Sequence, residues 1–234
     1  MTDTSSSGEH QAVTAPHPTR STYDRELTEV KDHVLRMGSL VERQIRAAIE
    51  ALVTHDAAAA TGVITGDRAI NDVQRETSEL ITLVIATQNP VARDLRYLLT
   101  LDHVSYELER MGDHASSVAK QARKLAPNAP LKDYVNLPKL GGLVADQVRG
   151  IVRALVDIDE TQARAVAAVD DDVDDLYHAI FASVLDLMRE SPDNVDPGTR
   201  ILFAAHYLER VGDRVTNIAE DIVFLASGQV EDLN

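Results

Sequence analysis

The hexapeptide Leu-Glu-Arg-Met-Gly-Asp at residues 108–113 recurs as Leu-Glu-Arg-Val-Gly-Asp at residues 208–213. Only one position differs, so the chain contains an internal repeat. Both copies lie in sequence with the apolar spacing of an α-helix, which places each Glu and the Asp four positions later on one helix face. Two such carboxylates repel each other, and a glycine inside a helix costs roughly 1 kcal/mol relative to alanine. The repeat therefore predicts a metal site at the acids and close helix packing at the glycine.

The repeat extends to whole helices. The first half contains a stripe of apolar residues, and a matching stripe occurs 103 positions later in the second half. Its three- and four-residue steps are typical of a helix that packs on a core. The paired positions are Val34 and Leu137, Met37 and Leu140, Val41 and Val144, Ile45 and Val148, Ala48 and Ile151, and Leu52 and Leu155.

Three long helices joined by short turns are predicted in each half. Asp56 and Asp159 are expected to cap the second helix of their halves, which run to about Thr87 and Glu190. Asn89-Pro90 is expected to begin the next helix, with Asn as its N-cap. The chain is thus predicted to be all-α, with two tandem three-helix bundles. We predict a disordered N-terminal tail at 1–20, bundles at 21–126 and 137–228, and a connector at 127–136.

Composition narrows the classes of function. The 234 residues are 44% apolar but only 4% aromatic, which favours a helical core of Ala, Leu, Val and Ile. The absence of Cys excludes disulfides and thiolate metal ligands. A net charge of −15 without a Lys/Arg cluster disfavours nucleic acid as a partner. With no signal sequence or membrane-spanning apolar run, we expect a soluble cytoplasmic protein.

A second set of polar residues repeats on the middle helices. Asp67 and Asn71 correspond to Asp170 and Asp174, again at i and i+4. Because the second and third helices of a three-helix bundle are neighbours, these side chains are expected to face the hexapeptide acids. Converging oxygen ligands are what Mg²⁺, Mn²⁺, Ca²⁺ or iron prefers. The predicted metal ligands are Asp67, Glu109, Asp113, Asp170, Asp174, Glu209 and Asp213.

Other interpretations of these acids remain open. Arg110 and Arg210 are three positions before an Asp, so each Asp could form a surface ion pair of little energetic value. The acidic run at 170–175 could be a solvated helix face, and Asp67 could be a helix cap. His206 and Glu220 lie on the face of the second hexapeptide and could add to its site. His103 and His114 receive no role.

Catalysis has little support in the sequence. No Gly-rich phosphate loop, nucleophile elbow or His-Glu-x-x-His motif is present. A di-iron oxidase requires Glu-x-x-His pairs, but Glu109 and Glu209 are followed three residues later by Gly. We therefore predict that the chain is not an enzyme. A carboxylate-bridged metalloenzyme, a metal-storage bundle and a plain helical scaffold without metal are the alternatives.

These motifs resemble the PhoU family of phosphate-signalling regulators over most of residues 23–225. The resemblance rests on the paired hexapeptides, on Gln-Asn-Pro-Val-Ala-Arg-Asp-Leu-Arg at 88–96 and on Thr-Asn-Ile-Ala-Glu at 216–220. It implies tandem three-helix bundles and metal clusters at the repeated acidic motifs. The metal would be divalent, with iron, zinc, manganese and magnesium all open.

The resemblance also implies a biological role. Members of this family are negative regulators of phosphate-starvation signalling that act between the Pst phosphate transporter and a PhoR-type sensor histidine kinase. A homodimer is expected, attached to the membrane only through its partners. The chain departs from the family pattern at three positions. Asn71 replaces a carboxylate, Arg214 stands where a His commonly follows the hexapeptide, and Lys120 occupies the position that corresponds to Glu220 in the second half. The second, more acidic site is therefore expected to be the stronger one.

Overall fold

The computed structural model describes residues 20–128 and 136–233, and every regular element within these ranges is helical. This confirms the predicted all-α class of two three-helix repeats. Residues 1–19 of the predicted tail and 129–135 of the predicted connector lie outside the described residues, whereas Arg20, which the prediction placed in the tail, is the first residue of α1. The elements are α1 (Arg20–Val53), α2 (Ala57–Gly66), α3 (Arg68–Gln88), α4 (Arg93–Leu125), α5 (Asn136–Asp157), α6 (Glu160–Ala167), α7 (Asp170–Glu190), the 3₁₀ turn η1 (Pro192–Asn194) and α8 (Val195–Ser227).

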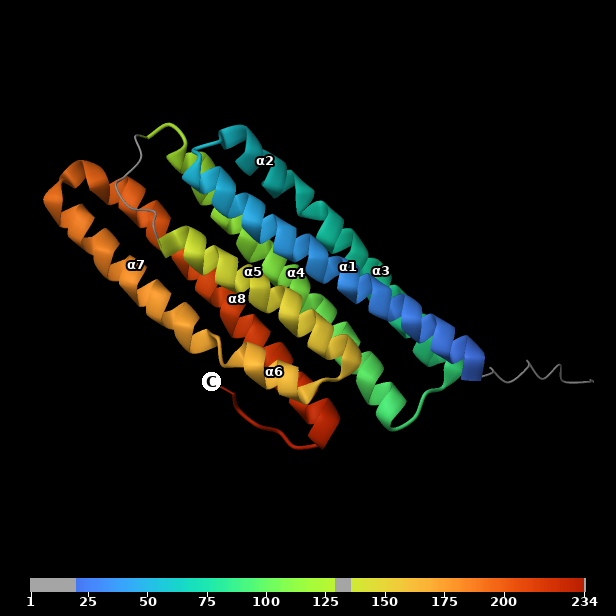
Figure 1. Ribbon diagram of the computed structural model, residues 1–234. Coiled ribbons are helices and arrows are strands. Elements are labelled where there is room, and N and C mark those ends of the chain that lie inside the picture. Colours follow the sequence, from blue (N-terminus) through green and yellow to red (C-terminus); the bar gives the residue numbers. More distant parts are fainter. Residues whose placement is uncertain (1–19, 129–135, 234) are drawn as a thin grey trace, which may run out of the picture.

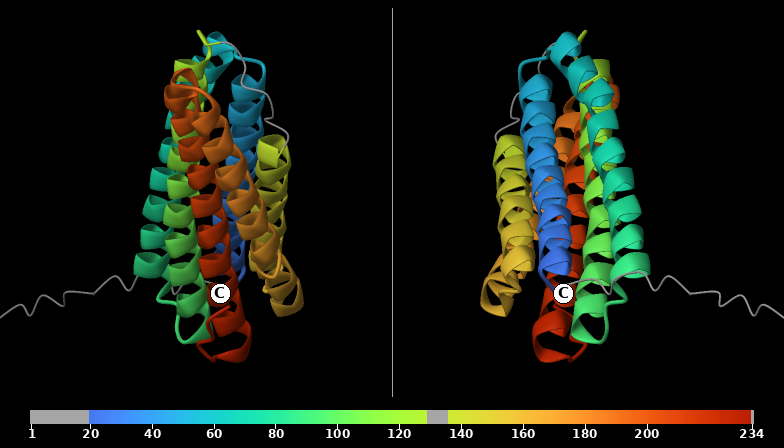
Figure 2. Two further views of the ribbon diagram at one scale, coloured as in Figure 1. Left: turned by 90° about the vertical axis from the view of Figure 1, so that its left-hand side faces the viewer. Right: turned by 90° about the vertical axis from the view of Figure 1, so that its right-hand side faces the viewer.

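Four long helices form the centre of the molecule. Helices α1, α4, α5 and α8 pack against one another, while α2 and α3 cover one side and α6 and α7 cover the other (Figure 1). Two further side views show the helices running alongside one another down the length of the molecule (Figure 2). The core consists mainly of Ala, Val, Leu and Ile, and its only aromatic side chains in the described ranges are Tyr23 and Tyr97. The low aromatic content of the sequence predicted this kind of core.

Each middle helix is broken, whereas the sequence predicted one continuous helix from about Asp56 to Thr87 and another from Asp159 to Glu190. The break between α2 and α3 falls at Asp67, whose backbone stays helical (φ −54°, ψ −34°). The break between α6 and α7 falls at residues 168–169, immediately before Asp170. The apolar spacing continues across both breaks, which is why periodicity did not indicate them.

The predicted caps met different outcomes. Asp56 accepts hydrogen bonds from the backbone N–H groups of Ala58 and Ala59, and Asp159 accepts one from Gln162. Both predicted N-caps are therefore confirmed. Asn89 was predicted wrongly: it is the C-cap of α3, in the left-handed conformation (φ 47°) that Asn tolerates. Helix α4 begins four residues later without a side-chain cap at its N-cap position.

The two halves join through close glycine contacts between α1 and α5. A Cβ atom at Gly38 would lie 2.8 Å from Val152, and one at Gly141 would lie 2.5 Å from Ile49. Gly38 corresponds to Gly141 and Ile49 to Val152 in the 103-residue register, so these are equivalent contacts seen from each half. The antiparallel helices approach closely because neither glycine carries a side chain. Both repeats thus share one continuous hydrophobic core.

The second junction between the halves is an antiparallel seam of α4 with α8. His103 Nδ1 lies 2.8 Å from Asp221 Oδ2, and Arg214 donates to Glu107 over 2.7 Å. Continuing this register brings Met111 opposite Val211, the only position that differs between the hexapeptides. Both side chains are fully buried. The two hexapeptides therefore pack against each other through Met111 and Val211, and the acids of each hexapeptide face the middle helix of their own half.

Candidate metal centres

In the second half, the four predicted metal ligands Asp170, Asp174, Glu209 and Asp213 lie close enough to influence one another's pKa values. Burial, followed by the negative charges of Asp174, Asp213 and Glu209, raises the pKa of Asp170 to about 6. A carboxyl group responds in this way when its charged form is desolvated and surrounded by like charge. The geometry thus brings together residues from the start of α7 and the middle of α8, as the repeat predicted.

Glu209 is the least satisfied acid of this cluster. Burial raises its pKa, followed by the charge of Asp213, whereas His206 and Arg210 lower it. Its Oε2 atom is buried and accepts no hydrogen bond, although His206 Nδ1 lies 3.2 Å away. A buried carboxylate oxygen without a donor is a natural ligand for a cation. His206 therefore lies beside the second site, as the sequence suggested.

The first half contains a smaller version of this cluster. Burial raises the pKa of Glu109, with the charges of Asp113 and Asp67 as the next causes. The three predicted acids of this half therefore converge as well. The position equivalent to Asp174 is Asn71, so one carboxylate fewer faces the hexapeptide.

The hexapeptide glycines, Gly112 and Gly212, leave space for the aspartates Asp67 and Asp170 of the middle helices. A Cβ atom at Gly212 would lie 2.9 Å from Asp170 Oδ1. At Gly112 it would lie 2.9 Å from Ile70 Cδ1 and 3.4 Å from Asp67 Oδ1. The sequence analysis interpreted these glycines as sites of close helix packing. The structure shows that an aspartate carboxylate is one of the groups that pack against each glycine. Glycine, Glu and Asp recur together because they build one site.

Two glutamines at the sites were missed by the sequence analysis. Gln44 on α1 is 8% exposed and donates to Asp67 Oδ1 over 3.0 Å. Its equivalent on α5, Gln147, is 3% exposed and donates to the backbone oxygen of Val166. The signal available in the sequence was their common register, 103 positions apart, within otherwise apolar stripes.

The side chains fit a metal by type and placement, but not by their present spacing. In residues 20–128 and 136–233, no three His, Asp or Glu side chains form a group that could hold a metal ion as they stand. Arg210 donates to Asp213 over 2.9 Å, and the remaining acids repel one another. The fit rests on oxygen donors, on the unbonded Glu209 oxygen and on the cradle at each glycine. Metal binding requires the acids to draw together.

Several residues with open roles lie elsewhere. Arg214 donates from Nε to His114 Nε2 over 3.3 Å, and the pKa of His114 falls to about 4 because of burial and the charge of Arg214. His103 belongs to the same seam through Asp221. The suggestion that Glu220 adds to the second site finds no support, because its Oε1 accepts from the backbone of Leu233 near the C-terminus.

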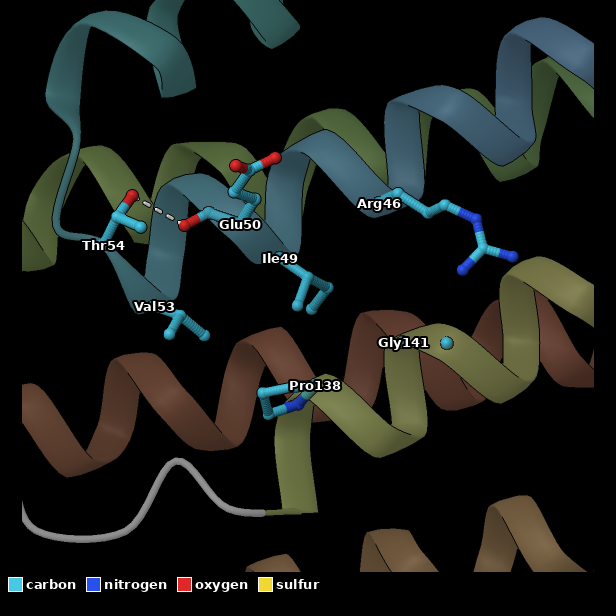
Figure 3. A pocket seen from close by; sticks show the side chains of 8 residues that line it. Arg46, Ile49, Glu50, Val53, Thr54, Pro138 and Gly141 are labelled. Carbon is cyan, nitrogen blue, oxygen red and sulfur yellow. Dashed lines mark hydrogen bonds between the residues drawn. The ribbon is translucent and has the colours of Figure 1, made fainter.

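A surface pocket lies apart from both acid clusters, between the end of α1 and the start of α5 (Figure 3). Ile49, Val53, Pro138 and Gly141 form its apolar wall, and Arg46 and Glu50 lie at its edge. None of the seven predicted metal ligands lines it. The pocket follows from the close approach of the two helices at Gly141.

Comparison with known proteins matches this geometry to a family. The family model described as the PhoU domain matches twice, at residues 34–122 and 137–222. The chain belongs to the PhoU family. The matched segments fall within the two predicted bundles at 21–126 and 137–228. These bundle limits themselves, and those of the tail and connector, stay predictions.

Relatives and solved structures agree with this assignment. The phosphate-specific transport system accessory protein PhoU homolog of Clostridium acetobutylicum is 37% identical, covering 92% of this chain and 99% of its own length. The crystal structure of PhoU from Pseudomonas aeruginosa superposes with a TM-score of 0.84 at 33% identity, over 88% of this chain and 100% of that one. PhoU from Streptococcus pneumoniae gives a TM-score of 0.83 at 28% identity, with 90% and 99% covered.

Family membership confirms several predictions. PhoU proteins are regulatory accessory proteins of phosphate transport, so the chain is not an enzyme and the metalloenzyme alternative is set aside. In the described ranges, no helix combines the length and the apolar character needed to cross a bilayer. The metal ligands, the metal and the partners stay predictions.

Proposed function

We propose that this protein is a cytoplasmic negative regulator of phosphate-starvation signalling, acting between the Pst phosphate transporter and a PhoR-type sensor histidine kinase. The names of its relatives, phosphate-specific transport system accessory proteins, support an accessory role in phosphate transport. The proposed working form is a homodimer that reaches the membrane only through these partners. Metal bound at the two acid clusters would neutralise the repulsion between carboxylates and stabilise the folded body by mass action.

The observation that carries the metal proposal is the convergence of Asp170, Asp174, Glu209 and Asp213 from two helices. Surface ion pairs give no reason for these acids to face one another around a glycine. The plain scaffold without metal is the competing hypothesis. It predicts an uncompensated acid cluster that is never filled in the cell.

The test is elemental analysis of protein purified without a His-tag or chelator, comparing wild type with the Glu209→Gln, Asp213→Asn double variant. We expect stoichiometric divalent metal in the wild type and loss of the second-site share in the variant. The matched control is Asp186→Asn, Glu190→Gln on the exposed end of α7, which should keep its metal. Equal metal content in all three proteins would contradict the site.

The regulatory part needs its own test. Deleting the gene should derepress a phosphate-starvation reporter in phosphate-rich medium, and the wild-type gene should restore repression. If the double variant restores repression fully, then metal at the second site is not required for signalling. If the wild-type gene does not restore repression, the regulatory proposal fails.

A further inference from the structure

Two buried amide oxygens lack any hydrogen-bond donor at equivalent places in the repeat. They are the Oε1 atoms of Gln44 and Gln147. An unsatisfied buried polar group costs on the order of 1–3 kcal/mol. A leucine at either position would continue the apolar stripe without this cost. One such oxygen would be unremarkable, but two in the same register require an explanation.

The orientation of both amides follows from chemistry. The Gln44 side chain faces a carboxylate, Asp67 Oδ1, at 3.0 Å, and that contact requires the NH₂ group. The Gln147 side chain faces the backbone oxygen of Val166 at 3.4 Å, which again requires the NH₂ group. In each case the amide oxygen must therefore point away from the acceptor. The missing partner belongs to the oxygen and cannot be removed by rotating the amide.

The two unbonded amide oxygens lie close to the hexapeptide glycines, Gly112 and Gly212. A Cβ atom at Gly112 would lie 3.2 Å from Gln44 Oε1, and one at Gly212 would lie 3.8 Å from Gln147 Oε1. The carboxylates of Asp67 and Asp170 approach the same two glycines. In each half an amide oxygen and a carboxylate oxygen thus lie within 4 Å of the glycine position, together with an apolar atom of Ile70 or Val173. The acids of the hexapeptide lie on either side of that glycine in the sequence.

A surface groove borders the first of these glutamines, although its amide oxygen is itself buried. A groove between α1 and α2 is lined by Gln44, Gly62, Gly66 and Ile70. The two glycines, which weaken α2 as a helix, leave this groove open beside the amide. The Gln44 side chain therefore lies at the wall of this groove.

We propose that Gln44 and Gln147 belong to the metal sites, each supplying a neutral amide oxygen from the first helix of its half to a hard divalent cation such as Mn²⁺ or Mg²⁺. This inference rests on the proposed metal-binding function. Carbonyl and carboxylate oxygens together suit these cations. Each site then takes oxygen donors from all three helices of its half, so a bound ion fastens the bundle together.

The two glutamines differ in a second role. Gln44 also fixes the carboxylate of Asp67 through its NH₂ group. Gln147 bonds the backbone beside the break between α6 and α7 and leaves Asp170 free. The second site therefore has the looser aspartate, and it depends more strongly on the amide oxygen itself.

The experiment is a calorimetric titration of metal-free protein with Mn²⁺, in a Glu109→Gln, Asp113→Asn background that reports the second site alone. Gln147→Leu is similar in size and removes the amide oxygen together with the NH₂ group that donates to Val166, and we expect Mn²⁺ affinity to fall at least tenfold. Gln147→Glu restores an oxygen donor and should restore binding. Thermal unfolding should show that Gln147→Leu folds at least as stably as the background protein, because it removes an unsatisfied polar atom.

The matched control is Gln121→Leu on α4. Gln121 is 7% exposed and its Oε1 is also unbonded, but it lies two helical turns beyond Asp113. Its replacement should leave Mn²⁺ affinity within twofold. If Gln147→Leu binds Mn²⁺ like the background, the amide assignment is wrong even though the site stands. If the background shows no binding that Glu209→Gln, Asp213→Asn removes, the site and this inference fail together.

Discussion

The two acid clusters occupy equivalent places in the repeat, yet they are satisfied to different degrees. In the first half, Asp67 accepts a hydrogen bond from Gln44 and the fourth position is the neutral Asn71. In the second half, burial and the charges of four other carboxylates raise the pKa of Asp170 to about 6. The scaffold of glutamine, aspartate and glycine is common to both halves. What differs is how much negative charge the scaffold holds without compensation.

The comparison teaches that the backbone plan and the charge load of a repeat can vary separately. The helix breaks, the glycine cradle and the buried amide recur in both halves. Position 106 is Tyr where position 206 is His beside Glu209, and Lys120 corresponds to Glu220. We expect unequal metal affinity from two sites with nearly the same geometry.

The strongest way to break the comparison is to exchange the fourth ligand. Asp174→Asn should weaken Mn²⁺ binding at the second site about 100-fold, because a ligand and a charge are lost together. Asn71→Asp should strengthen the first site about tenfold. Titration of each variant against Mn²⁺ measures both changes. Asp175→Asn, an exposed neighbour on α7, is the control, and an equal loss there would indicate a general charge effect.

A smaller difference should separate the two glycines. Gly212→Ala forces its Cβ against the carboxylate of Asp170 at 2.9 Å, and we expect about tenfold weaker Mn²⁺ binding at the second site. Gly112→Ala meets the end of the flexible Ile70 side chain at 2.9 Å and Gln44 Oε1 only at 3.2 Å, so first-site affinity should fall less, about threefold. Gly142→Ala meets no atom within 4 Å and should leave both affinities unchanged. Identical losses at both glycines would remove the distinction.

The smallest effect concerns stability without metal. The pKa of Asp170 is raised from 3.8 to about 6, so the folded state binds a proton more tightly than the unfolded state between these values. This carboxylate therefore lowers stability as the pH rises from about 4 to about 6, and the loss persists above. Asp170→Asn should raise the metal-free free energy of unfolding at pH 7.5 by about 1 kcal/mol, allowing for solvent screening. The gain should vanish near pH 4.

Denaturant unfolding at both pH values checks this prediction. Asp67→Asn is the matched variant in the first half, where the Gln44 amide already compensates the carboxylate, and it should not gain stability at pH 7.5. A larger gain for Asp67→Asn than for Asp170→Asn would reverse the ranking of the two sites.

Sequence alone predicted the parts of this molecule that local pattern controls. The apolar stripes from Val34 and Leu137 identified the first helix of each half, and Asp56 and Asp159 were recognised as caps. The pairing of middle-helix and hexapeptide acids followed from their common spacing. These features are local or repeat in register, so a single chain reveals them.

The features that sequence missed depend on contacts between helices. The repeat register pairs Gln44 with Gln147, but only the contacts with Asp67 and Gly112 show that Gln44 is buried at the site. The seam pair of Glu107 with Arg214 joins positions that no local rule connects. Asn89 was misassigned because Asn-Pro is as compatible with the end of one helix as with the start of the next.

The glycine contacts of Gly38 with Val152 and of Gly141 with Ile49 have the self-complementary form of an isologous interface between two subunits. Each half alone would expose that surface together with its side of the seam, and two copies of one half could pair through the same contacts. In such a symmetric ancestor, every substitution would appear in both metal sites at once. Fusion into one chain releases this constraint, since Asn71 can replace an acid in one site while Asp174 keeps it in the other.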